Sequence, residues 1–328
     1  MSQELSFGRM NTMNEPLITI GIAAFNAEDT IIEALESAIT QTWRNKEIII
    51  VDDCSSDRTI EIISKYRNYK NIFFYANKYN KGIAFVRNQI IKLSKGEFIA
   101  FFDDDDVSDP KRVEKQYQRI YQYEKKFNIH NHIICHTSRE VIRPNQEKYN
   151  LPVADSGIDD IAPHGEDVAK RILFGLYIKD CMGAMATCSQ MSRRSSYLDI
   201  NLFDENFRRS EDTELNIRFA MSGAHFIGIN EILVRQNSTL SDQKKLKYEL
   251  DSQLKYTYKY KEFIERNYSF DFLLLWIETK YRFLARNYLT FFLYLAKCII
   301  FHPVLSSRRL IMSAKNIKTN FFFSDTHK

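Results

Sequence analysis

Residues 96–110 of this chain read GEFIAFFDDDDVSDP. A short run of apolar and aromatic residues leads directly into four consecutive aspartates, Asp103 to Asp106. An apolar run of this length, bounded by polar residues, is typical of a buried strand. We therefore expect a strand over residues 97–106 whose end carries a cluster of carboxylates.

Strand and helix patterns alternate over residues 17–127. Strands are also expected at LITIGIAAF (17–25), EIIIVDD (47–53) and NIFFYA (71–76), and helices at residues 29–39, 59–66, 82–93 and 110–127. This alternation indicates an α/β fold with a parallel sheet covered by helices on both faces. Polar clusters end three of the strands, at residues 26–28, 52–53 and 103–106. Because ligands bind at the carboxyl ends of parallel strands, we expect the functional site at that edge.

The pattern after residue 127 is less regular. We expect strands at residues 132–137, 184–191 and 225–229, a helix at residues 211–222, and a loop over residues 143–165. Beyond residue 241 the pattern is helical, with few Gly or Pro residues before Pro303.

The aspartate cluster predicts a metal site. Adjacent carboxylates repel one another, and a divalent cation offsets that repulsion. Carboxylate oxygens suit Mg²⁺ or Mn²⁺, which can also bridge to substrate phosphates. The plain alternative is a solvated acidic turn in which Asp109 and Pro110 open the next helix.

Other phosphate-binding classes fit less well. Residues 105–109 match D-D-x-x-D, but that motif needs a helix to bring its carboxylates to one face, and here a strand precedes it and Pro110 follows. The first strand is followed by FNAEDT, which lacks the G-x-G-x-x-G pattern of dinucleotide-binding folds. An aspartyl-phosphate phosphatase would need aspartates at the end of that strand, where residues 23–26 read AAFN.

Five ordered motifs resemble family 2 glycosyltransferases. They are ITIGIAAFNAEDTIIEALESAITQT, EIIIVDDCSSDRT, GIAFVRN, GEFIAFFDDDDVSDP and SEDTELNIRFA, together covering about residues 17–235. The resemblance implies a GT-A fold, a Rossmann-like and mostly parallel sheet, in residues 17–239. It implies a nucleotide-sugar half (17–127) and an acceptor half (128–239), preceded by an N-terminal extension (1–16) and followed by a helical C-terminal region (240–328).

The resemblance also implies roles for residues near the nucleotide. Asp53 resembles the residue that reads the uracil edge. Ala23, Phe25 and Glu28 resemble residues that line the nucleotide. Arg87 resembles an arginine that helps to hold the nucleotide.

Further roles are implied for the acidic motifs. Asp103 and Asp105 match the family's D-x-D, with Asp105 resembling the direct metal ligand and Asp103 or Asp104 a ribose or water-mediated contact. Asp103 is also a candidate metal ligand. Asp212 resembles the general base, with Glu211 beside it. Taken without the other motifs, these two acids would be read as ordinary charge at a helix N-terminus.

The implied activity is metal-dependent, inverting transfer of one sugar, a hexose or N-acetylhexosamine, from a UDP-sugar to a saccharide hydroxyl. Mn²⁺ or Mg²⁺ is the implied cofactor, and a lipid-linked acceptor in surface-polysaccharide synthesis is the implied partner. Processive synthases of this family carry Q-x-x-R-W, and neither Trp43 nor Trp276 lies in that context. The alternative is a non-catalytic nucleotide- or sugar-binding protein that keeps the fold.

Two other clusters leave alternatives open. His130, His132 and His136 form H-x-H-x₃-H, which is better explained by histidines of a polar loop and strand than by a metal site. Residues 181–186 fall where related enzymes form the acceptor side of the cleft. A simple buried strand explains that stretch equally well.

The C-terminal region differs chemically from the rest. Residues 1–239 hold 30 Lys and Arg against 34 Asp and Glu, whereas residues 240–328 hold 16 against 8. The latter also carry 19 of the 44 aromatic residues. A helical subdomain packed on the core explains part of this composition. Contact with an anionic membrane surface better explains YLTFFLYLAKCIIFHPVLSSRR (288–309) and the AKNIK that follows it (314–318). Nucleic-acid binding is set aside because nothing in the first domain supports it.

The remaining composition points to the cytoplasm. The five cysteines are widely spaced with no C-x-x-C pair, the N-terminus is polar, and no stretch of ~18 apolar residues is free of charge. A chain that is 44% hydrophobic and 27% charged is neither disordered nor a small disulfide scaffold. We expect a cytoplasmic protein held peripherally at the inner membrane face, with its oligomeric state open.

Overall fold

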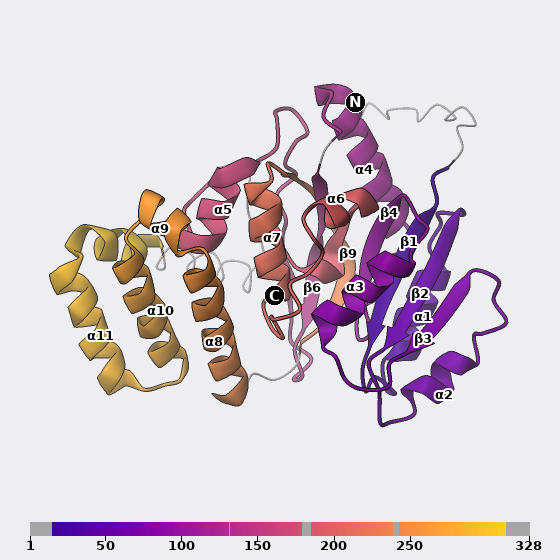
Figure 1. Ribbon diagram of the computed structural model, residues 1–328, viewed down its shortest axis with the longest axis horizontal. Coiled ribbons are helices and arrows are strands. Elements are labelled where there is room, and N and C mark those ends of the chain that lie inside the picture. Colours follow the sequence, from indigo (N-terminus) through magenta and orange to yellow (C-terminus); the bar gives the residue numbers. More distant parts are fainter. Residues whose placement is uncertain (1–14, 131, 179–184, 239–242, 313–328) are drawn as a thin grey trace.

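The computed structural model describes residues 15–130, 132–178, 185–238 and 243–312. In this part of the chain, nine strands form one mixed sheet in the order β3-β2-β1-β4-β8-β6-β9-β5, with β7 paired to β6 outside that path. Helices cover both faces of the sheet, and four further helices, α8 to α11, extend the molecule at one end (Figure 1).

Four parallel strands form the N-terminal part of the sheet, as the alternating pattern predicts. They are β1 (Ile18–Ala24), β2 (Lys46–Asp52), β3 (Ile72–Ala76) and β4 (Phe98–Asp103). Ala24 lies opposite Asp52, and Ala23 lies opposite Asp103. The polar residues that follow these strands therefore meet at one edge, which confirms that expectation.

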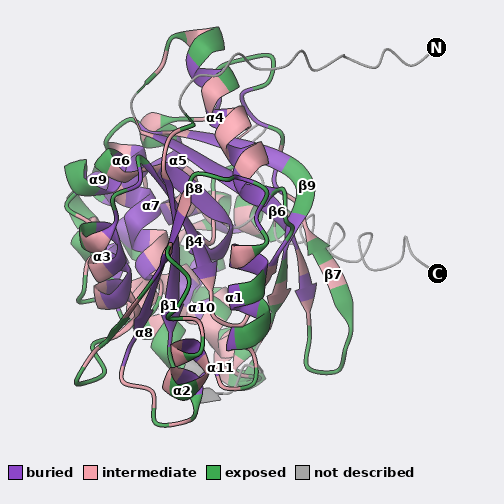
Figure 2. Ribbon diagram, turned by 90° about the vertical axis from the view of Figure 1, so that its right-hand side faces the viewer, coloured by how far each residue is buried: buried purple, intermediate pink, exposed green. Residues whose placement is uncertain are grey.

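Apolar side chains anchor helices on both faces of this sheet. One face carries α1 (Ile31–Ile39), α2 (Thr59–Ser64) and α4 (Arg112–Phe127), and the other carries α3 (Ile83–Leu93), α5 (Gly165–Phe174), α6 (Arg194–Asp199) and α7 (Glu211–Met221). Helix α3 packs directly on β1, because a Cβ added to Gly21 would lie 2.5 Å from Cγ2 of Ile90. As a result, the central strands are buried, and the helices on either side expose their outer faces (Figure 2).

The second half of the sheet differs from the sequence expectation. Strand β6 (Ile133–Ile142) is longer than expected and pairs in parallel with β9 (His225–Asn237), which is also longer than expected. In the expected strand at 184–191, residue 184 lies outside the described residues, and Thr187–Ser189 form a short 3₁₀ turn that leads into β8 (Gln190–Arg193). The expected loop over 143–165 contains β7 (Lys148–Leu151). The buried residues His136, Thr137 and Ser138 of β6 break the apolar pattern, which hid the length of the strand.

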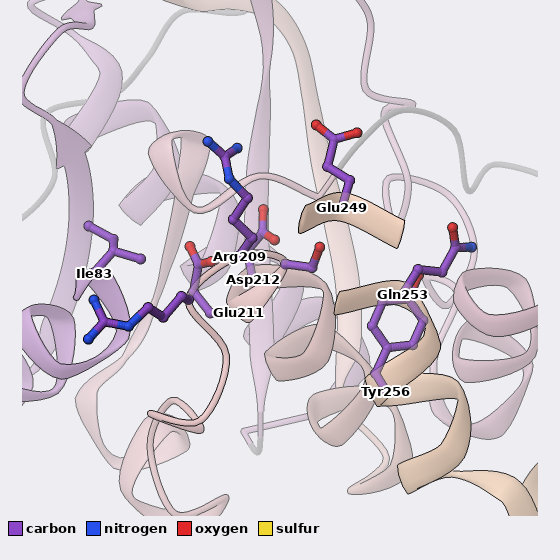
Figure 3. A pocket seen from close by; sticks show the side chains of 9 residues that line it. Ile83, Arg209, Glu211, Asp212, Glu249, Gln253 and Tyr256 are labelled. Carbon is purple, nitrogen blue, oxygen red and sulfur yellow. The ribbon is translucent and has the colours of Figure 1, made fainter. Parts of the chain in front are cut away.

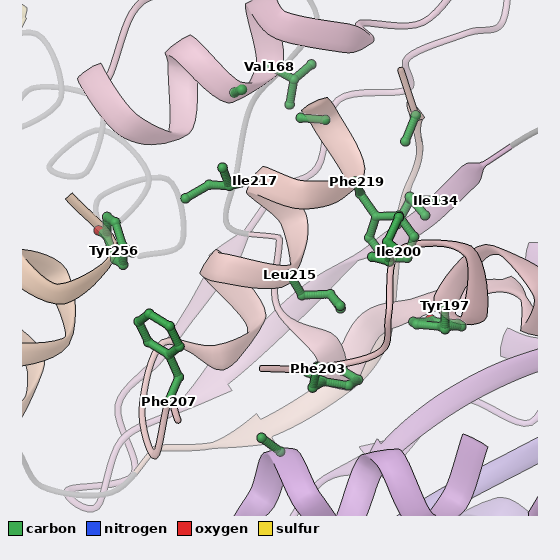
Figure 4. Close-up of a cluster of buried hydrophobic side chains, with 14 of the residues drawn as sticks. Ile134, Val168, Tyr197, Ile200, Phe203, Phe207, Leu215, Ile217, Phe219 and Tyr256 are labelled. Atoms are coloured by element: carbon green, nitrogen blue, oxygen red, sulfur yellow. The ribbon is translucent and has the colours of Figure 1, made fainter. Parts of the chain in front are cut away.

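Helix α7 is held by an apolar cluster. Leu215, Ile217 and Phe219 are fully buried, and Tyr197 of α6 packs edge-on against Phe219 with ring centroids 5.4 Å apart (Figure 4). The first residue of α7 is Glu211. The apolar cluster therefore fixes the position of the two acids, Glu211 and Asp212, that begin this helix.

The C-terminal helices are α8 (Gln243–Lys259), α9 (Lys261–Asn267), α10 (Phe270–Leu284) and α11 (Tyr288–Phe301). They join the core through Phe174 of α5, whose ring stacks on Tyr268 with centroids 4.9 Å apart. Helix α11 packs against α10, yet Cys298 is its only buried residue. None of the helices in the described ranges combines the length and the hydrophobicity needed to cross a membrane.

Candidate active site

The loops after β1 and β4 are tied together at the carboxyl edge of the sheet. The backbone N–H of Phe25 donates a hydrogen bond to Oδ2 of Asp104 at 2.8 Å. Phe25 itself is 47% exposed, and Ala23 is buried beside it. Glu28, three residues further on, pairs with Arg58 at 3.0 Å. Phe25, one of the residues expected to line the nucleotide, is therefore bonded through its backbone to the acidic cluster, while its ring faces solvent.

Asp53 holds the loop that leads into α3. Its carboxylate accepts hydrogen bonds from the backbone N–H groups of Lys81 and Gly82 and from Nδ2 of Asn77, at 2.7–3.1 Å. The side chain is buried. This geometry gives Asp53 a structural role in shaping the edge of the site, and the uracil contact stays a prediction.

Arg87 of α3 bridges two of the acidic motifs. Its Nη2 lies 3.0 Å from Oδ1 of Asp103, and its Nη1 lies 2.6 Å from Oε1 of Glu211. The guanidinium is buried, and its Cζ lies 6.0 Å from the ring centroid of Phe101 and 5.7 Å from that of Phe203. Burial disfavours the charged form, but the two carboxylates raise the pKa of Arg87, so the arginine remains charged. The three residues expected at separate positions of the site thus form one ion-pair network.

The acidic cluster is crowded and partly removed from water. Burial raises the pKa of Asp104 to about 7, that of Asp105 to about 6 and that of Asp106 to about 8. The charge of Asp103 accounts for part of each of these shifts. The Oδ2 atom of Asp106 is buried without a hydrogen-bond partner among the described residues. Carboxylates that are costly to ionise and incompletely satisfied fit a bound divalent cation.

One group of ligand atoms in the described part of the chain lies close enough to hold a metal ion. It consists of Asp103, Asp106 and Cys188, whose nearest atoms lie within 4.8 Å of one another. Asp105 is outside this group, although its carboxylate accepts no hydrogen bond from another described residue. The sequence predicts Asp103 and Asp105 as ligands and assigns no such role to Asp106 or Cys188. Asp106 was visible in the run of four aspartates, whereas nothing in the sequence pointed to Cys188.

The three histidines do not gather as a metal site in the described residues. His136 is buried in β6, while His130 is exposed beyond the end of α4. Burial, together with the charges of Arg139 and Arg112, lowers the pKa of His136 to about 3. The interpretation of these residues as histidines of a loop and a strand fits their positions.

Asp212 lies in a cavity of about 520 Å³. The cavity is lined by Ile83, Arg208, Arg209, Ser210, Glu211, Asp212, Glu249, Gln253 and Tyr256. Figure 3 shows Ile83 on one side and the three residues of α8 on the other, with Glu211 and Asp212 between them. Asp212 is half-buried, and its Oδ1 accepts a hydrogen bond from the N–H of Thr213 at 2.6 Å. A carboxylate that reaches a cavity in this way can contact a bound hydroxyl group.

The α8 side of the cavity was not predicted from the sequence. Glu249, Gln253 and Tyr256 lie in the region assigned to a basic, aromatic extension, and no motif marked them. In the stretch expected to contact the acceptor, residues 181–184 lie outside the described residues. Met185, which follows them, accepts a hydrogen bond through its carbonyl oxygen from Nδ2 of Asn216 on α7 at 2.8 Å.

A family model matches this edge and its surroundings. The model of glycosyl transferase family 2 aligns with residues 19–194, more than half of the chain. The chain belongs to glycosyl transferase family 2. The aligned range contains the first four of the five motifs and ends before Glu211 and Asp212.

Relatives of this glycosyl transferase family 2 chain include two bacterial proteins. It is 41% identical over 118 residues to UDP-Glc:alpha-D-GlcNAc-diphosphoundecaprenol beta-1,3-glucosyltransferase WfaP of Escherichia coli, an alignment that covers 36% of this chain and 47% of WfaP. It is 28% identical over 244 residues to the putative glycosyltransferase EpsE of Bacillus subtilis, covering 72% of this chain and 79% of EpsE. The match to WfaP thus spans about half the length of that relative.

The fold is shared with a solved structure. The crystal structure of residues 1–349 of S. aureus TarS in complex with UDP superposes with a TM-score of 0.56, covering 82% of this chain and 73% of that one, at 18% identity. An identity this low establishes the fold alone. The expected family and the expected GT-A fold with a C-terminal helical region are both confirmed.

Proposed function

We propose that this family 2 chain is an enzyme that transfers one sugar from a UDP-sugar to a saccharide hydroxyl with inversion at the anomeric carbon. The observation that carries the proposal is the connection from Asp103 through Arg87 to Glu211, which ends beside Asp212 in the cavity. This connection supports a single site shared by the acidic end of β4 and the proposed base.

The donor is proposed to lie at the carboxyl edge of β1, β2 and β4. Ala23 lies at the end of β1, and Phe25, Glu28 and Asp53 belong to the loops of that edge. A ribose or water-mediated contact is proposed for Asp104. UDP-sugar is proposed as the donor because the relative WfaP is named as a transferase that uses UDP-Glc.

Mn²⁺ or Mg²⁺ is the proposed cofactor. Asp103 and Asp105 are the proposed ligands, and the unpaired Oδ2 of Asp106 offers a further oxygen close to Asp103. When bound, such a cation stabilises the negative charge that a departing diphosphate acquires. Because Arg87 pairs with both Asp103 and Glu211, both carboxylates are held in position even when no substrate is bound.

Asp212 is proposed as the general base. The acceptor oxygen forms a bond to the anomeric carbon while the bond from that carbon to the diphosphate oxygen breaks. The hydroxyl proton passes to the Asp212 carboxylate, and the electron pair of the broken bond leaves with UDP. A single displacement of this kind inverts the anomeric centre. Proton removal by a positioned carboxylate contributes about 10²–10⁴-fold to such rates.

The acceptor is proposed to be a saccharide linked to a lipid through diphosphate, as part of surface-polysaccharide synthesis. The proposal rests on the relative WfaP, whose name gives alpha-D-GlcNAc-diphosphoundecaprenol as its acceptor. Such an acceptor would bring the protein to the cytoplasmic face of the membrane.

Helix α11 is proposed to lie against an anionic lipid surface. Leu289 is 78% exposed and Ile300 is 71% exposed, and the described residues place no partner over them. Exposed basic side chains stand in or near the same helix, at Lys280, Arg286, Lys297 and Arg308. Apolar side chains beside basic ones suit the boundary between headgroups and acyl chains.

A panel of UDP-sugars with Mn²⁺, scored for release of UDP, tests the proposed function. We expect slow hydrolysis of one or a few donors without acceptor, and we expect EDTA to abolish it. If no donor is hydrolysed or transferred, although UDP binds, the protein is instead the non-catalytic nucleotide-binding alternative.

A further inference from the structure

Helix α8 supplies one wall of the cavity that contains Asp212. Glu249, Gln253 and Tyr256 all line this cavity, and their spacing of four and three residues places them on one face of the helix. Figure 3 shows their side chains across the cavity from Ile83 of α3. The helix that follows the family-matched region by about fifty residues therefore takes part in the site.

The position of α8 is fixed relative to α7 by buried charge. Glu214 of α7 is fully buried and accepts hydrogen bonds from Nζ of Lys259 at 2.6 Å and from the Tyr260 hydroxyl at 2.8 Å. Lys259 also pairs with Asp204 at 2.7 Å. Because Glu214 is one turn beyond Glu211 on the same helix, these bonds hold α8 at a set distance from the proposed base.

The α8 wall has the chemistry that binds sugar hydroxyls. A carboxylate accepts hydrogen bonds, and an amide both donates and accepts them, so Glu249 and Gln253 together match vicinal hydroxyl groups. Burial and then the charge of Asp212 raise the pKa of Tyr256, which keeps its hydroxyl protonated as a donor. An uncharged polyol fits this set better than an anion does.

We propose that Glu249 and Gln253, with Tyr256 beneath them, form the subsite that selects the acceptor sugar. The inference rests on the proposed function. A general base must come within hydrogen-bonding distance of the acceptor hydroxyl, so the residues that share the Asp212 cavity surround the acceptor. The donor edge lies on the other side of Arg87, beyond Glu211. Glu249 and Gln253 are therefore specificity-determining residues for the acceptor rather than for UDP.

Steady-state kinetics of Gln253→Ala and Glu249→Gln test the subsite. The probes are glucose, galactose, N-acetylglucosamine and N-acetylgalactosamine, each linked through diphosphate to a short alkyl chain. With the best of these acceptors, we expect each variant to raise the acceptor KM about tenfold, the effect of one or two lost hydrogen bonds, and to change the KM for UDP-sugar less than about twofold. Asp251→Asn is the matched control, because it removes the same charge as Glu249→Gln from an exposed position on the same helix outside the cavity.

The results that overturn the subsite differ from the result that contradicts the proposed function. An unchanged acceptor KM in both variants, or a rise in the KM for UDP-sugar instead, overturns the subsite. Glu249 is exposed, so Glu249→Gln leaves folding intact even if Gln253→Ala does not. A wild-type protein that neither hydrolyses any UDP-sugar nor modifies any acceptor contradicts the proposed function itself.

Discussion

Arg87 and Glu211 are separated by 124 residues in sequence and by 2.6 Å between Nη1 and Oε1 in the structure. The pair joins α3, which packs under the strands that carry the first motifs, to the N-terminus of α7, which carries the last one. Since Arg87 also contacts Asp103, one buried guanidinium aligns the acidic end of β4 with the acids of α7.

Replacing Arg87 should lower the free energy of unfolding. Arg87→Met leaves Asp103 and Glu211 unpaired, and removing one partner of a buried ion pair costs about 3–5 kcal/mol. Denaturant unfolding of the purified variant measures this cost. Arg58→Met is the control, because Arg58 pairs with Glu28 at an exposed position and should change stability little. Equal stabilities of the Arg87 and Arg58 variants would contradict a structural role for the buried network.

Removing the proposed metal ligand should weaken UDP binding only when metal is present. Asp105→Asn keeps the shape of the side chain but removes its charge, so we expect Mn²⁺ to enhance UDP affinity much less than in the wild type. Calorimetric titration with UDP, with Mn²⁺ and with EDTA, separates the two contributions. Asp106→Asn tests the neighbouring carboxylate in the same way. If only Asp106→Asn removes the effect of Mn²⁺, the ligand is Asp106 rather than Asp105.

His136 should make the protein sensitive to acid. Burial holds its pKa at about 3 in the folded state, against 6.5 for an ordinary histidine, so between these values the unfolded chain binds a proton that the folded chain does not. Stability is therefore lost as the pH falls from about 6.5 towards 3. We expect His136→Gln to flatten the decline of the unfolding free energy between pH 6.5 and 4. His130→Gln, at an exposed position, should leave that decline unchanged, and a parallel decline in both variants would contradict the assignment.

Charges placed on α11 should release the protein from lipid. Leu289→Glu and Ile300→Glu add a negative charge to the exposed apolar residues, so both should reduce co-sedimentation with phosphatidylethanolamine–phosphatidylglycerol vesicles. Tyr79→Glu, at a 72% exposed position in the N-terminal half, is the control. If the wild type does not bind the vesicles but forms dimers that these substitutions dissociate, the helix contacts a second copy of the chain instead.

The N-terminal half of the fold could be predicted because its strands are short apolar runs between clear helical patterns. Both β1 and β4 are buried on two faces, so apart from Thr19 near the start of β1 they contain no polar residue until each reaches the site. The length of strand β6 could not be predicted in this way, because the strand buries four consecutive polar residues, His136 to Arg139. The identity of a polar residue does not reveal that it is buried.

The site could be predicted in part for a related reason. Residues at strand ends of a parallel sheet meet at one edge, so the convergence of the β1, β2 and β4 loops followed from the order of the elements. The pairing of Arg87 with Glu211 and the contribution of α8 depend on tertiary packing between distant segments. Cys188 lies close to Asp103 for the same reason, because β8 pairs with β4 in the antiparallel direction.

The transfer rates of Asp212→Asn and Asp271→Asn decide whether Asp212 is the general base. Both aspartates are the second residue of a helix, so both substitutions remove the same favourable interaction with a helix dipole, but only Asp212 lies in the cavity. With the donor and acceptor that the wild type uses, we expect Asp212→Asn to lower the transfer rate at least ~100-fold while metal-dependent UDP binding persists, and Asp271→Asn to retain the wild-type rate. A normal transfer rate in Asp212→Asn would contradict the account.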